Sequence, residues 1–149
     1  MKRGWLVVAC VVIVALGVIL STMRIKVATT PEAPCSSLPY SDYSAEIRTD
    51  SLTELLVEFG DVPYSATAVK SIRLKNTTDK PLVFVGYQAT CRCTTIDLPQ
   101  KAVEPNCWAE AEIKFDSRGE YGSVGNHIEV NTSDERCVIS IWISAEVIN

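Results

Sequence analysis

The chain has 149 residues, of which 21% are charged and 47% hydrophobic, with seven Gly and seven Pro. This composition excludes disordered, collagen-like and low-complexity chains, and the length allows one domain of ordinary size. The formal net charge is −4. Because phosphate contacts need clustered Lys and Arg, and the sequence has no such basic patch, we expect no nucleic-acid binding.

The charge is unevenly distributed along the chain. The first 26 residues carry four basic and no acidic side chains, whereas the rest carry 10 basic and 18 acidic ones. Within this basic start, residues 4–23 are uncharged, and as a helix they would extend about 30 Å, the thickness of a bilayer core. Trp5 lies near one end of this run, at interface depth. Residues 1–26 are therefore predicted to be a signal anchor with one transmembrane helix.

Two other fates of this N-terminal segment stay open. Ala15-Leu16-Gly17 offers small residues for signal-peptide cleavage, although cleavage there would leave an apolar new N-terminus. Val7-Val8-Ala9-Cys10 is similar to a bacterial lipobox with Cys10 as the lipidated residue, although the apolar run continues beyond it. The uncleaved anchor is favoured over both.

The cysteines indicate the compartment. Five of the six follow the predicted anchor, and so many thiols fit an oxidising compartment better than a reducing one. We therefore expect a single-pass protein of the cell membrane whose C-terminal part is extracytoplasmic. The five are Cys35, Cys91, Cys93, Cys107 and Cys137.

The rest of the chain divides into a stalk and a β-rich body. Residues 27–50 contain three prolines among Ser, Thr and Ala, which predicts an extended stalk. The hydrophobic period becomes two in the body, residues 51–149, most clearly over residues 109–116, where apolar and charged residues alternate. About seven such strands, separated by turns, predict an all-β, seven-stranded immunoglobulin-like sandwich. A small closed barrel is the alternative fold.

Six short segments of the body, in this order and spacing, also resemble a known family. They are Val57-Glu58-Phe59-Gly60-Asp61-Val62, Ile72-Arg73-Leu74-Lys75-Asn76-Thr77, Lys80-Pro81-Leu82-Val83-Phe84, Thr90-Cys91-Arg92-Cys93-Thr94, Ala111-Glu112-Ile113-Lys114-Phe115-Asp116 and Ile128-Glu129-Val130-Asn131-Thr132. Over about residues 53–147 the chain resembles the bacterial Ig-like domain of unknown function fifteen seventy-three, a relative of Hydin-type β-sandwich domains. The resemblance implies an exported, often membrane-attached module without an assigned activity or catalytic residues.

Cys107 and Cys137 are the favoured disulfide. Each begins a predicted strand, and Greek-key connections place the starts of these two strands at the same end of the sandwich. Cys91 and Cys93 end the third predicted strand, so we expect them at the opposite end.

The Cys91-Arg92-Cys93 motif leaves three interpretations open. Residues two apart on a regular strand point to one face, so the pair could form a redox-active disulfide. It could instead bind Cu(I) or another thiophilic metal through two thiolates. The third interpretation is structural, with one or both cysteines buried or one paired with Cys35 in the stalk. The motif alone is a weak signal, because zinc sites usually show C-x-x-C spacing.

The sequence contains no evident catalytic constellation. His127 is the only histidine and falls on the polar face of a predicted strand, so we expect an exposed surface residue rather than a catalytic base. Glu110 and Glu112 alternate with apolar residues, which is typical of a solvated strand face. No Ser nucleophile elbow or phosphate-binding Gly loop occurs. We therefore expect neither an enzyme nor a bound cofactor.

Function is predicted in two versions. The first is a membrane-anchored extracytoplasmic Ig-like module with a binding or structural role, whose partner is an unknown envelope protein or glycan. Trp142, Tyr121 and Tyr87 are its candidate contact residues, because exposed aromatic residues are enriched at interfaces. The alternative is a thiol-redox or copper-handling protein that uses Cys91 and Cys93.

Overall fold

The computed structural model describes Cys35 and residues 41–149. The predicted membrane segment, residues 4–23, lies outside this part of the chain, and so does Cys10. Within the described part, no helix has the length and hydropathy needed to cross a membrane.

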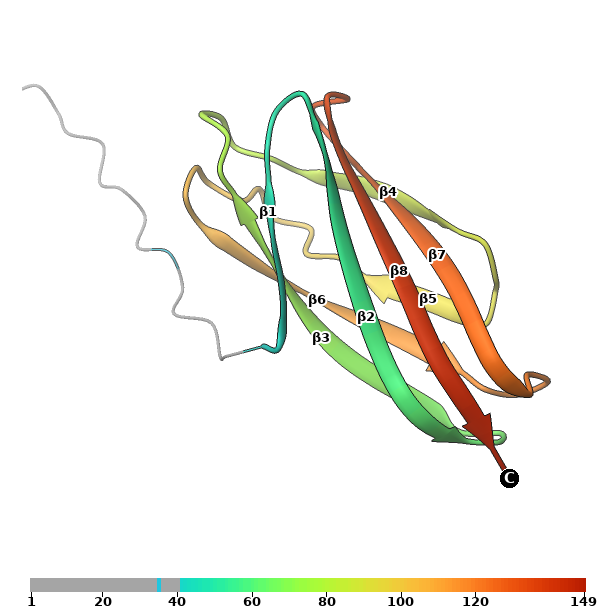
Figure 1. The fold of residues 1–149 in the computed structure, drawn as a ribbon. Helices are drawn as coiled ribbons and strands as arrows, with labels where there is room; N and C mark the ends of the chain where they lie inside the picture. Colours follow the sequence, from blue (N-terminus) through green and yellow to red (C-terminus); the bar gives the residue numbers. More distant parts are fainter. Residues whose placement is uncertain (1–34, 36–40) are drawn as a thin grey trace, which may run out of the picture. The chain divides into compact units, whose positions relative to one another are not determined.

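In the part of the chain that the structure describes, eight β-strands form two four-stranded sheets that pack face to face (Figure 1). One sheet has the strand order β1-β3-β6-β5, and the other has the order β2-β8-β7-β4. The strands are β1 (Tyr43–Ile47), β2 (Ser51–Pro63), β3 (Thr67–Asn76), β4 (Phe84–Ala89), β5 (Thr94–Asp97), β6 (Trp108–Asp116), β7 (Gly122–Thr132) and β8 (Cys137–Ile148). The fold is therefore an all-β, two-sheet sandwich, as the sequence predicted, but with eight strands rather than seven.

The first strand lies inside the segment that was predicted to be a stalk. β1 pairs in parallel with β3, with Tyr43 opposite Ile72 and Ile47 opposite Asn76. Ile47 is fully buried, so β1 contributes to the core. The prediction that the sandwich begins at residue 51 is therefore wrong. β1 is only five residues long and follows a Pro-rich segment. Its alternation of apolar and polar residues is therefore too short to be recognised as a strand from the sequence.

The core lies between the two sheets and follows the period-two pattern. In β8 the inward residues Ile139, Ile141 and Ile143 are all buried. This strand is central in its sheet, because it pairs in parallel with β2 and antiparallel with β7. The facing sheet contributes Phe115, whose ring centroid lies 5.9 Å from that of Phe59. Burial of each such side chain stabilises the fold by about 1.5–3 kcal/mol.

The connections gather at two ends of the sandwich (Figure 1). β6 and β8 both begin at the end where β3 finishes, so Cys107 and Cys137 belong to this end. Thr94, at the start of β5, pairs with Phe115 near the far end of β6. Cys91 and Cys93 therefore lie at the opposite end, together with the β2–β3 and β6–β7 turns. This separation of the cysteines confirms the prediction.

A buried asparagine organises the end at which β3 finishes. The Asn76 side chain is fully buried, and its Nδ2 donates to the carbonyls of Lys80 and Val103, both at 2.8 Å. Its Oδ1 accepts from the backbone N–H of Thr78 at 3.0 Å and from the Thr78 hydroxyl at 2.7 Å. Four hydrogen bonds of one side chain thus hold the β3–β4 connection against residue 103.

We predict that Asn76→Ala lowers the free energy of unfolding by roughly 2–4 kcal/mol, because it removes the four hydrogen bonds of a fully buried side chain. Denaturant unfolding followed by Trp fluorescence measures the loss. Asn131→Ala is the matched control, since Asn131 is only half-buried and its side chain makes no hydrogen bond in the described part of the chain. Equal stability of the two variants would contradict the role assigned to Asn76.

Candidate functional site

The connection between β4 and β5 carries the chain from one sheet to the other. We call residues 90–93 the crossing loop. The backbone N–H of Thr90 donates to the carbonyl of His127 in β7 at 3.0 Å, and the N–H of Asp116 in β6 donates to the carbonyl of Cys93 at 2.8 Å. Backbone hydrogen bonds therefore attach the crossing loop to both sheets.

Cys91 and Cys93 form a disulfide with each other in the crossing loop. Both residues are half-buried, whereas Arg92 between them is exposed. The sequence left three interpretations of this pair open: a disulfide, a metal site and a structural role. In the structure the two cysteines are disulfide-bonded. It also excludes a bond from either cysteine to Cys35 in this state.

Two polar side chains lie against the sulfur atoms. Nδ2 of the buried Asn126, in β7, donates to Cys93 Sγ at 3.2 Å and to Thr94 Oγ1 at 2.9 Å. Oε1 of Glu120, in the β6–β7 turn, lies 3.8 Å from Cys91 Sγ. The backbone N–H of Cys93 donates to Cys91 Sγ at 3.0 Å. The N–H donors would stabilise a thiolate, and the carboxylate can accept a proton from a thiol.

Glu120 and Asn126 were missed by the sequence analysis. The sequence around Glu120 predicts only a turn, and nothing in it indicates that Glu120 lies next to the sulfur of Cys91. Asn126 did leave a signal, because it is a polar residue at an inward position that continues the Ile128 and Val130 alternation. A polar residue on a core face needs a partner, and here the partners are Cys93 and Thr94.

The same residues define the candidate metal site. One ligand atom from each of Cys91, Cys93 and Glu120 lies within 4.8 Å of the other two. A disulfide supplies no thiolate, so Cu(I) or another soft metal would bind only after reduction of the pair. Two thiolates and one carboxylate would then be the available ligands.

The predicted Cys107–Cys137 disulfide is wrong. Cys107 is bonded to Cys35, with a Cα–Cα distance of 5.2 Å and a sequence separation of 72. Cys107 precedes β6 in one sheet, whereas Cys137 begins β8 in the other, so a shared end does not make them partners. Cys137 is the free cysteine of the described residues and is buried. Burial raises the pKa of the Cys137 thiol, which makes it unreactive.

The outer surface of the β2-β8-β7-β4 sheet is the second candidate site. We call it the acidic face. Its outward residues include five carboxylates, three large apolar side chains and one histidine: Glu54, Glu58, Asp61, Glu129, Glu146, Leu52, Leu56, Trp142 and His127. In the described chain, none of these five carboxylates is in an ion pair, and no Lys or Arg is among the outward residues of the four strands. By contrast, the outer surface of the other sheet carries Arg73, Lys75 and Lys114.

His127 is less exposed than the sequence predicted. Its Nε2 lies 2.8 Å from Ser140 Oγ, and its ring centroid lies 4.5 Å from that of Trp142. Trp142 itself is 51% exposed, in agreement with its assignment as a candidate contact residue. Tyr121 and Tyr87 are also exposed, but neither is among the outward residues of the acidic face.

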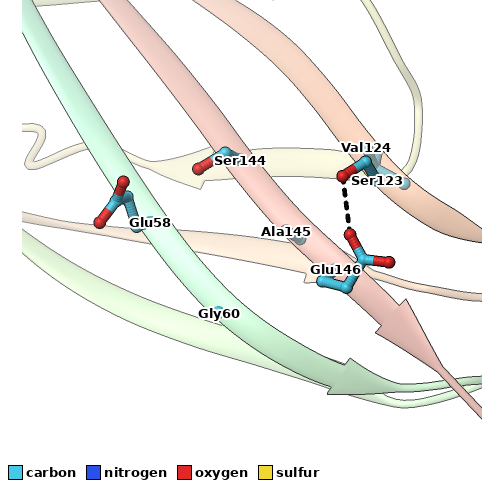
Figure 2. Close-up of a pocket in the computed structure, with 7 residues that line it drawn as sticks. All are labelled: Glu58, Gly60, Ser123, Val124, Ser144, Ala145 and Glu146. Carbon is cyan, nitrogen blue, oxygen red and sulfur yellow. Dashed lines mark hydrogen bonds between the residues drawn. The ribbon is translucent and has the colours of Figure 1, made fainter.

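A shallow hollow of about 350 Å³ lies on the acidic face, where residues of β2, β7 and β8 line it (Figure 2). Glu58 of β2 lines it on one side, and Ser144 and Glu146 of β8 line it on the other. Ser123 donates a hydrogen bond to Glu146 at 2.7 Å. The β2–β8 register shifts here, and Gly60 adopts a φ of 70°, which favours glycine in such a bulge.

Comparisons with known proteins support the fold and give no activity. The profile of the family described as "Protein of unknown function (DUF1573)" matches residues 51–147. A protein of unknown function from Porphyromonas gingivalis W83 aligns with a TM-score of 0.55 and 14% identity over 72% of this chain and 49% of the other, so this chain spans about half its length. PapD-like domain 7 of human CEP192, an ASH/PapD-like domain, aligns with a TM-score of 0.55 and 14% identity over 78% of this chain and 92% of that domain. No protein of curated function matches the sequence.

The two disulfides are predicted to differ in their effect on stability. A disulfide that closes a 72-residue loop removes chain entropy worth roughly 4 kcal/mol, whereas one that closes a two-residue loop removes about 1 kcal/mol. We expect Cys35→Ser/Cys107→Ser to lower the free energy of unfolding far more than Cys91→Ser/Cys93→Ser. Denaturant unfolding of the two double variants measures this, and equal losses would contradict the assignment.

Thiol titration checks the pairing directly. In a Cys10→Ser chain, we expect no reactive thiol in the native state and one thiol after denaturation, because Cys137 is buried and the other four cysteines are bonded. A thiol-specific chromophore gives the count. A reactive thiol in the native protein, or more than one after denaturation, would show that the pairing is different.

Proposed function

The chain belongs to the DUF1573 family of proteins of unknown function, and we propose that it is an extracytoplasmic Ig-like module that binds a protein of the bacterial envelope. Residues 4–23 attach it to the membrane. The acidic face is its contact surface, and the partner presents Lys and Arg around apolar side chains. Binding at this face requires no catalytic residue.

The disulfides support the extracytoplasmic location. Two form within the described part of the chain, and disulfides persist in oxidising compartments. One of them joins Cys35, twelve residues after the predicted membrane segment, to Cys107 at the start of β6.

The composition of the acidic face carries the proposal. Leu56 and Trp142 are cross-strand neighbours on β2 and β8, and both are about half exposed, at 55% and 51%. Aromatic anchors surrounded by polar residues are typical of protein–protein contact surfaces. Five carboxylates without a basic neighbour create a negative potential around these anchors, and a cationic partner surface would complement it. A neutral glycan is the other partner class, and it would use the aromatic ring without a strong dependence on charge.

We predict that a photo-crosslinking residue at position 56 captures a partner from intact cells that express the full-length chain. The same residue at position 69 is the matched control, because Val69 is 48% exposed on the outer surface of the other sheet. The captured protein should be released by rising ionic strength, since exposed charge pairs are screened by salt. Equal capture from both positions, or none from position 56, would refute the proposed surface.

Charge reversal separates the two partner classes. Glu58→Lys/Glu129→Lys should abolish crosslinking at position 56, whereas Glu112→Lys on the other sheet should leave it unchanged. If both variants retain full crosslinking, charge complementarity does not drive the interaction. If a glycan array binds wild type and the Glu58→Lys/Glu129→Lys variant equally, the partner is a glycan and the proposed protein partner is wrong.

A further inference from the structure

The Cys91–Cys93 disulfide contributes little to the stability of the fold. The entropy that a disulfide removes from the unfolded chain grows with the length of the loop it closes, and here the separation is two residues. The crossing loop is already attached to both sheets by the backbone bonds of Thr90 and Cys93. Reduction would therefore leave the sandwich folded, and both cysteines are only half-buried.

We propose that Cys91 and Cys93 form a thiol–disulfide exchange site that oxidises dithiols in accessible polypeptide segments. Glu120 accepts the proton of the attacking thiol, and Asn126 stabilises the thiolate that leaves. This activity goes beyond partner binding and uses residues outside the acidic face.

The surroundings of the two sulfur atoms distinguish their roles. Cys93 packs against the buried core, whereas Cys91 does not, so Cys91 Sγ is the more accessible target. The Glu120 carboxylate lies 3.8 Å from this sulfur and makes no ion pair within the described residues, which leaves it available to a proton. Cys93 Sγ receives the Asn126 N–H at 3.2 Å, and such a donor stabilises a negative charge on sulfur.

The exchange takes two displacement steps. In the first, a substrate thiol attacks Cys91 Sγ and gives its proton to Glu120; the Cys91–Cys93 bond breaks, and its electron pair leaves on Cys93 as a thiolate. In the second, another substrate thiol attacks the substrate sulfur of this mixed disulfide. Cys91 then leaves and takes the proton back from Glu120, while the second substrate proton passes through solvent to Cys93. The substrate loses two electrons and two protons, and the protein gains them.

The reduced site needs an oxidant to act again. A low-molecular-weight disulfide such as oxidised glutathione can supply it by the same two displacements in reverse. In the disulfide between Cys35 and Cys107, the Cys107 sulfur is a poor target for such exchange, because Cys107 is only 9% exposed, whereas Cys35 is exposed. Among the described residues, only the crossing loop combines half-buried cysteines with an adjacent carboxylate.

The test is single-turnover oxidation of a reduced peptide with two cysteines by the purified full-length chain, without oxygen, between pH 5.5 and 8. We expect wild type to oxidise one equivalent of peptide and Cys91→Ser/Cys93→Ser to oxidise none. In wild type the rate should level off at low pH, because the neutral thiol reacts through Glu120. In Glu120→Gln it should fall about tenfold per pH unit, following the thiolate fraction of a thiol with a pKa near 8.5. Glu104→Gln, an exposed control, should behave as wild type.

Two results would overturn the proposal. Peptide oxidation that does not depend on Cys91 and Cys93 would show that this pair is not an exchange site. Equal pH slopes for wild type and Glu120→Gln would remove Glu120 as the proton acceptor. Both variants change exposed or half-buried side chains, and circular dichroism verifies that they fold.

Equilibration with glutathione tests Asn126 separately. Asn126→Asp keeps the size of the side chain but replaces the donor with an acceptor, so we expect the equilibrium to move toward the disulfide by roughly tenfold or more. Thr94→Ser, which keeps the hydroxyl partner of Asn126, should leave it unchanged. An unchanged equilibrium in Asn126→Asp would overturn the role of this donor.

Discussion

The attachment of the crossing loop to both sheets is the constraint on which the arrangement of the sites depends. Thr90 is bonded to β7 of one sheet, and Cys93 is bonded to β6 of the other. Because the chain changes sheets between these two bonds, the two cysteines are held at the end of the sandwich and cannot continue a regular strand. The same geometry brings Asn126 of β7 and Glu120 of the β6–β7 turn against the two sulfur atoms.

The sandwich thus separates three kinds of chemistry in space. The Cys35–Cys107 disulfide joins the N-terminal segment to one end, and the Cys91–Cys93 disulfide occupies the other. The acidic face lies between them on the outside of one sheet. The topology fixes the ends of the strands and so the places of the two disulfides. The acidic face follows from the period-two alternation, since outward residues can vary without disturbing the core. The proposed binding surface and the proposed thiol-exchange site are therefore separate parts of the sandwich.

The sequence predicted those features that depend on local alternation and not those that depend on contacts between distant elements. The β6 strand was predicted from its own residues, because apolar and charged side chains alternate over residues 109–116. β1 was missed because this strand is identified by its backbone pairing with β3, which lies about thirty residues away in the sequence. The predicted partner of Cys107 was wrong for the same reason. Its true partner, Cys35, precedes β1, and the sequence alone does not show that this residue lies near the start of β6. Asn126 gave a local signal, yet its sulfur partner could be identified only from the fold.

The exchange rates of two backbone amides test the central claim most directly. The claim is that hydrogen bonds, and not the Cys91–Cys93 disulfide, hold the crossing loop to the sheets. Hydrogen–deuterium exchange compares the amides of Thr90 and Asp116 in wild type and in Cys91→Ser/Cys93→Ser. We predict equal protection in both proteins. Loss of protection at these two amides, while core amides such as that of Ile141 stay protected, would contradict the account.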